Sequence, residues 1–507
     1  MRWSVGRLAE TLNVPPPAGL DPMAGVDGFS IDSRMIEAGE LFLAIHGPRH
    51  DGHAFVAASL ERGARAAVVA GERLAEYPEG IRARLFAVED TLGALHRLAS
   101  RACEIWRQGD TDRRIAAVAG SVGKTTTKEI LAALLGARRR VLKTQGNLNN
   151  EYGLPLTLLK LGDEYDAAVV EMGMSHSGEL AQLARIASPD VGVITRVAIE
   201  HLEFFSSIEE IALAERELIE NLAWPNATAV LNADDERVAA FAKVARGRVI
   251  LFGTNGLAGG DSGEQARERA GGWAKFRAEK IEDRGIEGCA FDFVSPDGRA
   301  RLELPLIGRH NVMNAVAALA AASLWDVGAA DAKRVFPSLM PADKRGEVVR
   351  FEEGFSVIND SYNSSPTALA ALTELLAATP GYRRRILAAG EMLELGASAP
   401  ELHRECGRTA AEWKKIDWII GVRGNGEEIV SGAVAAGHPR ERTKFFADSE
   451  EAGTFLGEFV RPGDLLLLKG SRGVRMEKIL DAIDAQHKRA AASSRAEVTA
   501  GEGKGRG

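Results

Sequence analysis

A glycine-rich loop between a predicted strand and a predicted helix constrains this chain more than any other segment. The apolar run Ile115–Ala119 has the length and composition of a buried strand. The loop Gly120-Ser-Val-Gly-Lys-Thr-Thr126 follows it, and Thr126–Leu135 then places its large apolar residues on one helical face before Gly136. A loop of this composition, between a strand and a helix, is typical of a phosphate-binding site.

The residue types in this loop suit a nucleotide with bound Mg²⁺. Glycines let backbone N–H groups close around phosphate oxygens, and the helix N-terminus adds partial positive charge. Lys124 is predicted to neutralise the β- and γ-phosphates, and Thr125 to place a hydroxyl on Mg²⁺. The alternative is a strand–helix turn that binds nothing. The predicted nucleotide-binding residues of the loop are Gly120, Ser121, Val122, Gly123, Lys124, Thr125 and Thr126.

Two residues farther along the chain are candidate metal ligands. Glu171 directly follows the apolar run Ala167–Val170, so we expect it at the carboxyl end of a neighbouring strand. A carboxylate in that position can hold Mg²⁺ directly or through water; the alternative is a solvated strand-end acid. His201 follows the next apolar run, Val191–Thr195, and is either a second ligand or a structural histidine.

Composition limits the class of protein. The chain has 507 residues, 45% of them hydrophobic and 26% charged, and its formal net charge is −8. This length predicts two to four globular domains at about 100–200 residues each, and the acidic balance argues against nucleic-acid binding. No apolar run is long enough to span a bilayer, and no signal-peptide core is evident near the start. Three scattered cysteines form no disulfide or zinc pattern, so we expect a cytoplasmic protein; they are Cys103, Cys289 and Cys406.

Short apolar runs alternate with helical stretches over most of the chain, which predicts an α/β fold with parallel sheets covered on both faces. A polar break at Gln108-Gly-Asp110 and a new α/β unit near Pro341 divide the chain. The predicted divisions are a small N-terminal α/β domain at 1–107, a central P-loop domain at 108–338, a C-terminal α/β domain at 339–488, a disordered tail at 489–507, and a flexible loop at Gly256–Gly272.

Further blocks accompany the loop in order along the chain. Together they resemble the Mur ligases, the ATP-dependent amide-forming enzymes of peptidoglycan synthesis, over roughly residues 25–480. The resemblance implies an N-terminal domain for a UDP-linked substrate, a central ATP-binding domain and a Rossmann-like C-terminal ligase domain. The blocks are Asp32-Ser-Arg34, Asp51-Gly-His-Ala-Phe55, Gly120–Thr126, Thr144–Thr157, Gly308–Asn314, Asp360–Pro366 and Lys469–Arg472 with Met476-Glu477.

The resemblance also implies a reaction. ATP would transfer its γ-phosphoryl group to the terminal carboxylate of UDP-N-acetylmuramoyl-tripeptide, and the amine of D-alanyl-D-alanine would attack the acyl phosphate to give the pentapeptide, ADP and phosphate. Two anions must meet, so the site needs cations: Lys124, Mg²⁺ and an arginine. ATP and Mg²⁺ are the expected cofactors, the partners are these small molecules, and a monomer is expected because nothing in the sequence requires an oligomer.

By resemblance, individual residues receive roles. The catalytic group is Lys124, Glu171, His201 and Arg345, and the implied metal ligands are Thr125, Glu171, His201 and Glu215. The implied substrate contacts are Ser33 and Arg34 for the UDP part, Asn147 and Asn150 for the muramoyl part, and Tyr362 and Asn363. The implied nucleotide contacts outside the loop are His310, Asn311 and Asn314 near adenine, Arg345 at the phosphates and Asp360 at the ribose. The alternatives are polar residues on an exposed helical turn for the two asparagines and a turn residue for Asp360.

One position departs from the family pattern. Most Mur ligases carry a lysine in the helix after the histidine motif, and its carbamate binds a second Mg²⁺. Here the corresponding position is Glu215, and no lysine occurs between Ile208 and Leu222. A carbamate and a carboxylate are both anionic oxygen donors, so we hypothesise that Glu215 replaces the carbamylated lysine, directly or through water. The alternative is a solvated glutamate beside a weak or absent second metal.

The sequence alone leaves two other functions as alternatives. The chain could be another Mur-type or folylpolyglutamate-synthase-like amide ligase, although the blocks at Asn147–Thr157 and Lys469–Glu477 argue against this. It could also be a catalytically weak nucleotide-binding relative. Phosphate release from ATP, with and without D-alanyl-D-alanine, separates the three readings.

Overall fold

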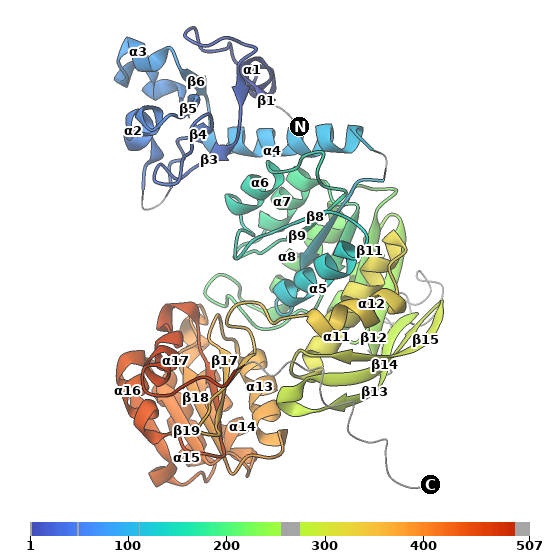
Figure 1. Cartoon of the computed structure of the whole chain (residues 1–507), viewed down its shortest axis with the longest axis vertical. Coiled ribbons are helices and arrows are strands. Elements are labelled where there is room, and N and C mark those ends of the chain that lie inside the picture. The colour runs from blue at the N-terminus through green and yellow to red at the C-terminus, as the bar shows by residue number, and fades with distance from the viewer. Residues whose placement is uncertain (1–2, 48–49, 111, 255–273, 492–507) are drawn as a thin grey trace. The chain divides into compact units, whose positions relative to one another are not determined.

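The computed structural model describes residues 3–47, 50–110, 112–254 and 274–491 (Figure 1). The chain forms two compact units. The first unit contains 1–283, 289–305 and 309–340, and the second contains 284–288, 306–308 and 341–507. The loop predicted at Gly256–Gly272 and the tail from 492 onward lie outside the described residues. Within the described ranges, no helix combines the length and apolar character needed to cross a membrane.

The first unit begins with a four-stranded parallel sheet in the order β3-β4-β5-β6. Two apolar runs of this part form strands β4 and β5, and their side chains are almost all buried. The elements of this part are β1 (Trp3–Ser4), α1 (Val5–Leu12), β2 (Gly25–Val26), β3 (Phe29–Ser30), β4 (Leu41–Leu43), α2 (Val56–Glu61), β5 (Ala66–Ala70), α3 (Glu79–Arg82), β6 (Leu85–Val88) and α4 (Thr91–Gln108).

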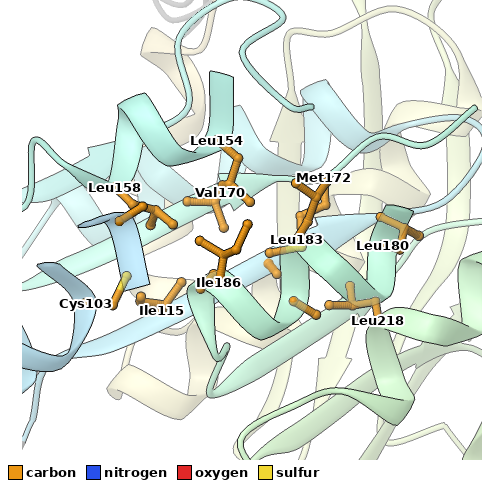
Figure 2. Packing of buried hydrophobic residues seen from close by; sticks show 14 of the residues in the cluster. Cys103, Ile115, Leu154, Leu158, Val170, Met172, Leu180, Leu183, Ile186 and Leu218 are labelled. Carbon is orange, nitrogen blue, oxygen red and sulfur yellow. The ribbon is translucent and has the colours of Figure 1, made fainter. Parts of the chain in front are cut away.

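Helix α4 joins this part to the rest of the first unit through a shared core. Its N-cap Asp90 accepts from the backbone of Leu92, and one helical face is buried along the whole length. Cys103 of that face lies in the same apolar cluster as Leu158 and Ile186 (Figure 2). The sequence break at residues 108–110 therefore does not separate two independent cores.

A nine-stranded sheet forms the centre of the first unit, in the order β15-β14-β13-β12-β11-β10-β7-β9-β8. The strands from β8 to β13 are parallel, as expected, and β14 and β15 pair antiparallel at one edge, which the alternation of strands and helices did not predict. A two-residue turn, Pro296-Asp297, joins β14 to β15, which allows antiparallel pairing without a crossover helix. The strands are β7 (Arg114–Ala119), β8 (Val141–Lys143), β9 (Ala167–Glu171), β10 (Val191–Ile194), β11 (Thr228–Asn232), β12 (Arg248–Thr254), β13 (Phe276–Asp283), β14 (Cys289–Ser295) and β15 (Gly298–Leu304).

Helices accompany the parallel part of this sheet. The helix predicted after the glycine-rich loop is α5, and it packs against α11, an alanine-rich helix (Figure 1). Almost every α11 side chain beyond its first turn is buried, which explains its alanine content. The helices are α5 (Lys124–Gly136), α6 (Gly153–Leu158), α7 (Glu179–Ala187), α8 (Ile208–Glu220), α9 (Glu236–Ala240), α11 (Arg309–Ala322) and α12 (Ala329–Val335).

The second unit is built on a six-stranded sheet in the order β16-β17-β21-β18-β19-β20. All pairs are parallel except the edge pair β16–β17, as expected for the α/β domain predicted at 339–488. The elements are β16 (Glu347–Arg350), β17 (Ser356–Asp360), α13 (Pro366–Ala378), β18 (Arg384–Gly390), α14 (Ala399–Glu412), β19 (Trp418–Val422), α15 (Gly426–Ala435), β20 (Thr443–Phe446), α16 (Ser449–Phe459), β21 (Asp464–Lys469) and α17 (Glu477–Asp484).

The first residues of the predicted tail take part in this unit. Arg489 pairs with Phe351 through an isolated antiparallel bridge, and the Ala490 backbone donates to the Arg350 carbonyl at 2.8 Å. These backbone contacts extend the unit past residue 488.

Candidate active site

The glycine-rich loop connects β7 to α5, as predicted, and its two glycines are sterically required. Gly120 has φ 120° and Gly123 has φ 93°, conformations that side chains disfavour. A Cβ on Gly120 would lie 2.2 Å from Thr195 Oγ1, and one on Gly123 would lie 2.3 Å from Asn314 Oδ1. The loop therefore contacts both the end of β10 and the start of α11.

The residues that follow β10 brace the loop from the side. The Ser121 backbone donates to the Arg196 carbonyl at 2.7 Å, and Ala198 N–H donates to Ser121 Oγ at 2.9 Å. Thr195 Oγ1 donates to the Val122 carbonyl at 2.6 Å. These bonds fix the predicted phosphate-binding residues Ser121 and Val122 in one conformation, while the Arg196 side chain itself is exposed.

The predicted phosphate-binding lysine lies over this loop. Lys124 Nζ donates to the carbonyls of Gly120 and Ser121 at 2.5 and 3.2 Å, and lies 3.9 Å from Glu200 Oε1. That Glu200 oxygen is buried and has no hydrogen-bond partner among the described residues. Glu200 was not predicted as a site residue, because a glutamate next to a histidine carries no pattern of its own. Beside Lys124, the first turn of α5 carries Thr125 and Thr126.

Glu171 ends β9, which pairs with β7 so that Glu171 lies opposite Val118, just before the loop. The side chain is 3% exposed, and its Oε1 accepts from Asn149 Nδ2 at 2.9 Å. Its backbone N–H donates to Thr144 Oγ1 at 3.0 Å. Within the described chain, Glu171 Oε2 accepts no hydrogen bond.

Glu215 and His201 also belong to this end of the sheet. Glu215 is 1% exposed on α8, and its Oε2 has no hydrogen-bond partner in the described part of the chain. Burial raises the Glu215 pKa to about 8; Glu200 raises it further, whereas Lys124, His201 and a backbone hydrogen bond from Gly120 lower it. The solvated alternative for Glu215 is therefore wrong. His201 has φ 52°, and its Nε2 lies 3.8 Å from Glu200 Oε2.

These residues fit Mg²⁺ as part of a coordination shell. Among the described residues, no three His, Cys, Asp or Glu side chains gather closely enough to hold a metal by themselves. The unpartnered carboxylate oxygens of Glu171 and Glu215 and the Thr125 hydroxyl are donors of the type that Mg²⁺ prefers. Mg²⁺ normally completes its octahedron with phosphate oxygens and water, so a partial protein shell is what a nucleotide-linked ion needs.

The predicted adenine-side residues divide into two groups. Asn311 and Asn314 are buried in the first turns of α11, where Asn314 Nδ2 donates to Asn311 Oδ1 at 2.9 Å. Asn314 lies next to Gly123 of the glycine-rich loop, and Asn311 is bonded to Asn314. Because both are buried, the alternative of an exposed helical turn is wrong for them. His310 is exposed at the start of the same helix.

The block after β8 places its asparagines differently from one another. Asn147 is exposed, and Asn150 Oδ1 accepts from the backbone of Gly153 at 2.9 Å, which starts α6. The neighbouring Asn149 instead reaches Glu171. The substrate role of Asn147 and Asn150 stays a prediction, and Asn149 is a residue that the sequence did not single out.

Ser33 and Arg34, predicted to hold the UDP part, lie in the loop between β3 and β4. Arg34 forms a two-point contact with Asp32 at 2.9 and 2.7 Å, and this contact lowers the Asp32 pKa to about 2. The Arg34 side chain is 84% exposed. Its role at the substrate stays a prediction.

In the second unit, the predicted residues gather at the carboxyl ends of β17 and β21. The Arg345 guanidinium lies 4.2 Å from the centre of the Tyr362 ring, and the Arg472 guanidinium 5.6 Å from it. Asp360 forms an ion pair with Lys469, whose Nζ also donates to the Asn363 carbonyl at 2.9 Å. The sequence placed Arg472 and Lys469 in a motif without giving either a role.

Comparison with known families accounts for most of the chain. Residues 25–102 match the family model described as "Mur ligase family, catalytic domain", residues 118–322 match "Mur ligase middle domain", and residues 344–472 match "Mur ligase, glutamate ligase domain". The chain belongs to the Mur ligase family. The three matched regions follow one another in the order of the three-domain Mur ligase architecture.

Individual family members are similar over nearly their whole length. The UDP-N-acetylmuramoyl-tripeptide–D-alanyl-D-alanine ligase of Bacillus subtilis is 34% identical, over 90% of this chain and 92% of that protein. The crystal structure of MurF from Acinetobacter baumannii has a TM-score of 0.81 and 28% identity, and covers 95% of this chain and 99% of that one. MurF ligase from Thermotoga maritima, solved in complex with ADP, has a TM-score of 0.75 and 29% identity, covering 91% of this chain and 98% of that one.

Proposed function

We infer that this Mur ligase joins D-alanyl-D-alanine to UDP-N-acetylmuramoyl-tripeptide, with hydrolysis of ATP to ADP and phosphate, in peptidoglycan synthesis. The observation that carries this inference is the match along 90% of the chain to relatives named for that reaction. The glycine-rich loop, with Lys124 and two buried carboxylates beside it, supplies the phosphoryl-transfer machinery that the reaction needs.

The reaction proceeds through an acyl phosphate. A carboxylate oxygen of the tripeptide attacks the γ-phosphorus of ATP, and ADP leaves. The D-alanyl-D-alanine amine then attacks the acyl carbon, the tetrahedral intermediate expels inorganic phosphate, and the amine loses a proton. The first attack brings two anions together, and the second builds negative charge on the tetrahedral oxygen and the leaving phosphate, so positioned cations and N–H donors lower both barriers.

Different residues of the first unit bind the phosphates, neutralise their charge and hold the metal ion. The loop N–H groups and the N-terminus of α5 bind phosphate oxygens, and Lys124 neutralises the charge that accumulates on the transferred group. Bound Mg²⁺ would neutralise phosphate oxygens and hold them in line. We propose that Thr125 and Glu171 hold this ion, with His201 as a further ligand. We assign Asn311 and Asn314 to the nucleotide because they adjoin the loop.

Glu215 supplies the negative charge that a carbamylated lysine gives to other family members. Its burial and its unpartnered Oε2 support this role, because an isolated buried carboxylate is unfavourable unless a cation joins it. A glutamate arm is shorter than a carbamylated lysine arm, so the contact can run through a metal-bound water.

The proposed function is tested by phosphate release from ATP in the presence of UDP-N-acetylmuramoyl-tripeptide. Release should require the tripeptide and increase strongly when D-alanyl-D-alanine is added, with the pentapeptide product seen by mass spectrometry. Release that ignores the dipeptide would contradict the assignment. Release with single amino acids but not the dipeptide would indicate a different Mur ligase reaction.

We also propose that the ligase acts as a single copy in the cytoplasm, where its nucleotide substrate is available. The proposed loop, lysine and carboxylates all come from one chain. Light scattering of the purified protein tests the oligomeric state; a stable dimer whose activity falls on dilution would contradict it.

A further inference from the structure

A buried lysine one turn beyond Lys124 has no part in the mechanism above. Lys128 lies on α5 and is 1% exposed. Its Nζ donates to the Thr144 carbonyl at 2.9 Å and lies 2.8 Å from Glu129 Oε1 and 3.8 Å from Glu171 Oε2. Burying an ammonium group costs several kcal/mol unless oxygens replace its water. The three oxygens around Lys128 meet that need, but an apolar side chain would meet the packing need without them.

The two oxygens of the Glu171 carboxylate have different surroundings. Oε1 accepts from Asn149 Nδ2 at 2.9 Å, whereas Oε2 faces Lys128 at 3.8 Å, beyond hydrogen-bond distance. Lys128 is closer to Glu129 and to the Thr144 carbonyl, and these two contacts hold it back from Glu171. The carboxylate is therefore fixed at one oxygen and open at the other.

Asn149 is itself held by the strand end that carries Glu171. The Gly173 backbone donates to the Asn149 carbonyl at 2.9 Å. A Cβ on Gly173 would lie 2.9 Å from Asn149 Nδ2, so a glycine is needed for this approach. Thr144, at the other end of the same loop, accepts from the Glu171 backbone. The loop 144–149 thus contacts Glu171 at both its backbone and its side chain.

We propose that Lys128 and Asn149 are positioning residues that orient the Glu171 carboxylate, with Oε2 presented to the magnesium ion of the nucleotide. Asn149 fixes the rotation of the carboxylate through Oε1. Lys128 balances the negative charge without occupying Oε2, and Glu129 shares its charge between Lys128 and Lys143. This inference rests on the proposed function, since it assigns Glu171 to the metal of the ligase reaction.

Metal binding tests this role separately from catalysis. Mn²⁺ serves as the probe, with its binding followed by electron paramagnetic resonance in the presence of a non-hydrolysable ATP analogue. Lys128→Met and Asn149→Ala should each weaken Mn²⁺ binding about 10- to 100-fold, the range found when partners of metal ligands are removed. Lys128→Arg should recover part of the loss. Lys160→Met, at an exposed position outside this set of contacts, is the control and should bind Mn²⁺ like the wild type.

The steady-state readout should move in the same direction. The Mg²⁺ concentration needed for half-maximal rate should rise in both variants while the KM for D-alanyl-D-alanine stays unchanged. If Lys128→Met does not fold, Asn149→Ala, a partly exposed loop position, decides the question. Wild-type Mn²⁺ affinity in folded Asn149→Ala and Lys128→Met would overturn the proposal. A wild-type protein that binds Mn²⁺ with the analogue but releases no dipeptide-dependent phosphate would instead contradict the proposed function.

Discussion

The acidic residues at the carboxyl ends of the two large sheets differ in whether the protein itself provides them with a partner. At the nine-stranded sheet, Glu171 and Glu215 are buried, and each keeps one carboxylate oxygen without a hydrogen bond in the described structure. At the six-stranded sheet, the acid is Asp360, and it is already paired with Lys469. At the first sheet end, Lys128 lies 3.8 Å from Glu171 Oε2, but the buried Glu215 Oε2 has no hydrogen-bond partner among the described residues; at the second, the acid is paired within the protein.

This difference distinguishes an acid that needs an added cation from an acid that stabilises the metal-free fold. A buried, unpaired carboxylate destabilises the protein until a cation arrives, whereas a paired one leaves its partner uncompensated when it is removed. Neutralising Glu215 should therefore stabilise the metal-free protein, whereas neutralising Asp360 should destabilise it. The four predictions below test that contrast.

The largest effect is expected at Lys124. Lys124→Met removes the cation that lies over the loop, so kcat for dipeptide-dependent phosphate release should fall about 100- to 1000-fold. Lys124 donates to carbonyls of its own loop and also lies 3.9 Å from Glu200, so the melting temperature is measured beside the rate to separate loss of catalysis from loss of stability. Lys160→Met, at an exposed position, is the control. A fall in kcat of less than tenfold would contradict a role for Lys124 in stabilising the transition state.

Glu215 comes next. Glu215→Gln removes the charge but keeps the shape, and the rate should fall about 10- to 100-fold, comparable with loss of a group that supports a metal site. Glu215→Lys restores the residue type of most family members, so its rate should rise with added bicarbonate, to which the wild type should be insensitive. An unchanged rate in Glu215→Gln would refute the role given to this residue.

The same substitution should have the opposite effect on stability when metal is absent. Burial raises the Glu215 pKa from 4.5 to about 8, so the folded protein holds a proton that the unfolded chain releases. The stability of the wild type relative to Glu215→Gln is greatest below about pH 4.5 and is lost as the pH rises through about 8. Between about pH 5 and pH 8 the difference in unfolding free energy should shift by about 3–4 kcal/mol in favour of Glu215→Gln.

Urea unfolding in EDTA at several pH values measures this shift. Glu220→Gln, on the same helix but partly exposed, should show no comparable trend. Addition of Mg²⁺ with an ATP analogue should favour the wild type again. If the difference in unfolding free energy between the wild type and Glu215→Gln does not change with pH, Glu215 is ionised in the folded protein without metal.

The smallest effect is expected at the balanced sheet. Asp360→Asn leaves the buried Lys469 ammonium with the Asn363 carbonyl but no anion, so the unfolding free energy should fall by about 1–2 kcal/mol. The double variant Asp360→Asn with Lys469→Met should regain part of that loss. A higher unfolding free energy in Asp360→Asn than in the wild type would contradict the proposed difference between the two sheets.

The sequence predicted the parts of the site that depend on local pattern. The strand, loop and helix around Gly120–Thr126 form as expected, and Glu171 and Glu215 are buried beside that loop. The antiparallel strands β14 and β15 were missed, because their pairing depends on a tight turn and not on strand–helix alternation.

Residues that act through long-range contacts were also missed. Lys128 looks like any charged residue of an amphipathic helix until the fold buries it against Thr144 and Glu171. Asn149 sits between two asparagines that were singled out, and only the three-dimensional path of its loop shows that it is the one that meets Glu171. Periodicity and motif spacing carry no information about such contacts.

The approach of Gly123 to Asn314 has a consequence for how this chain can vary. The two positions lie in different sequence blocks, yet a single methyl group at Gly123 would collide with the Asn314 side chain. A side chain at position 123 is therefore disfavoured twice, by this collision and by a φ of 93°, and a smaller residue at position 314 would relieve only the collision. Tolerance to mutation in the loop is set by its own backbone as well as by the helix packed against it.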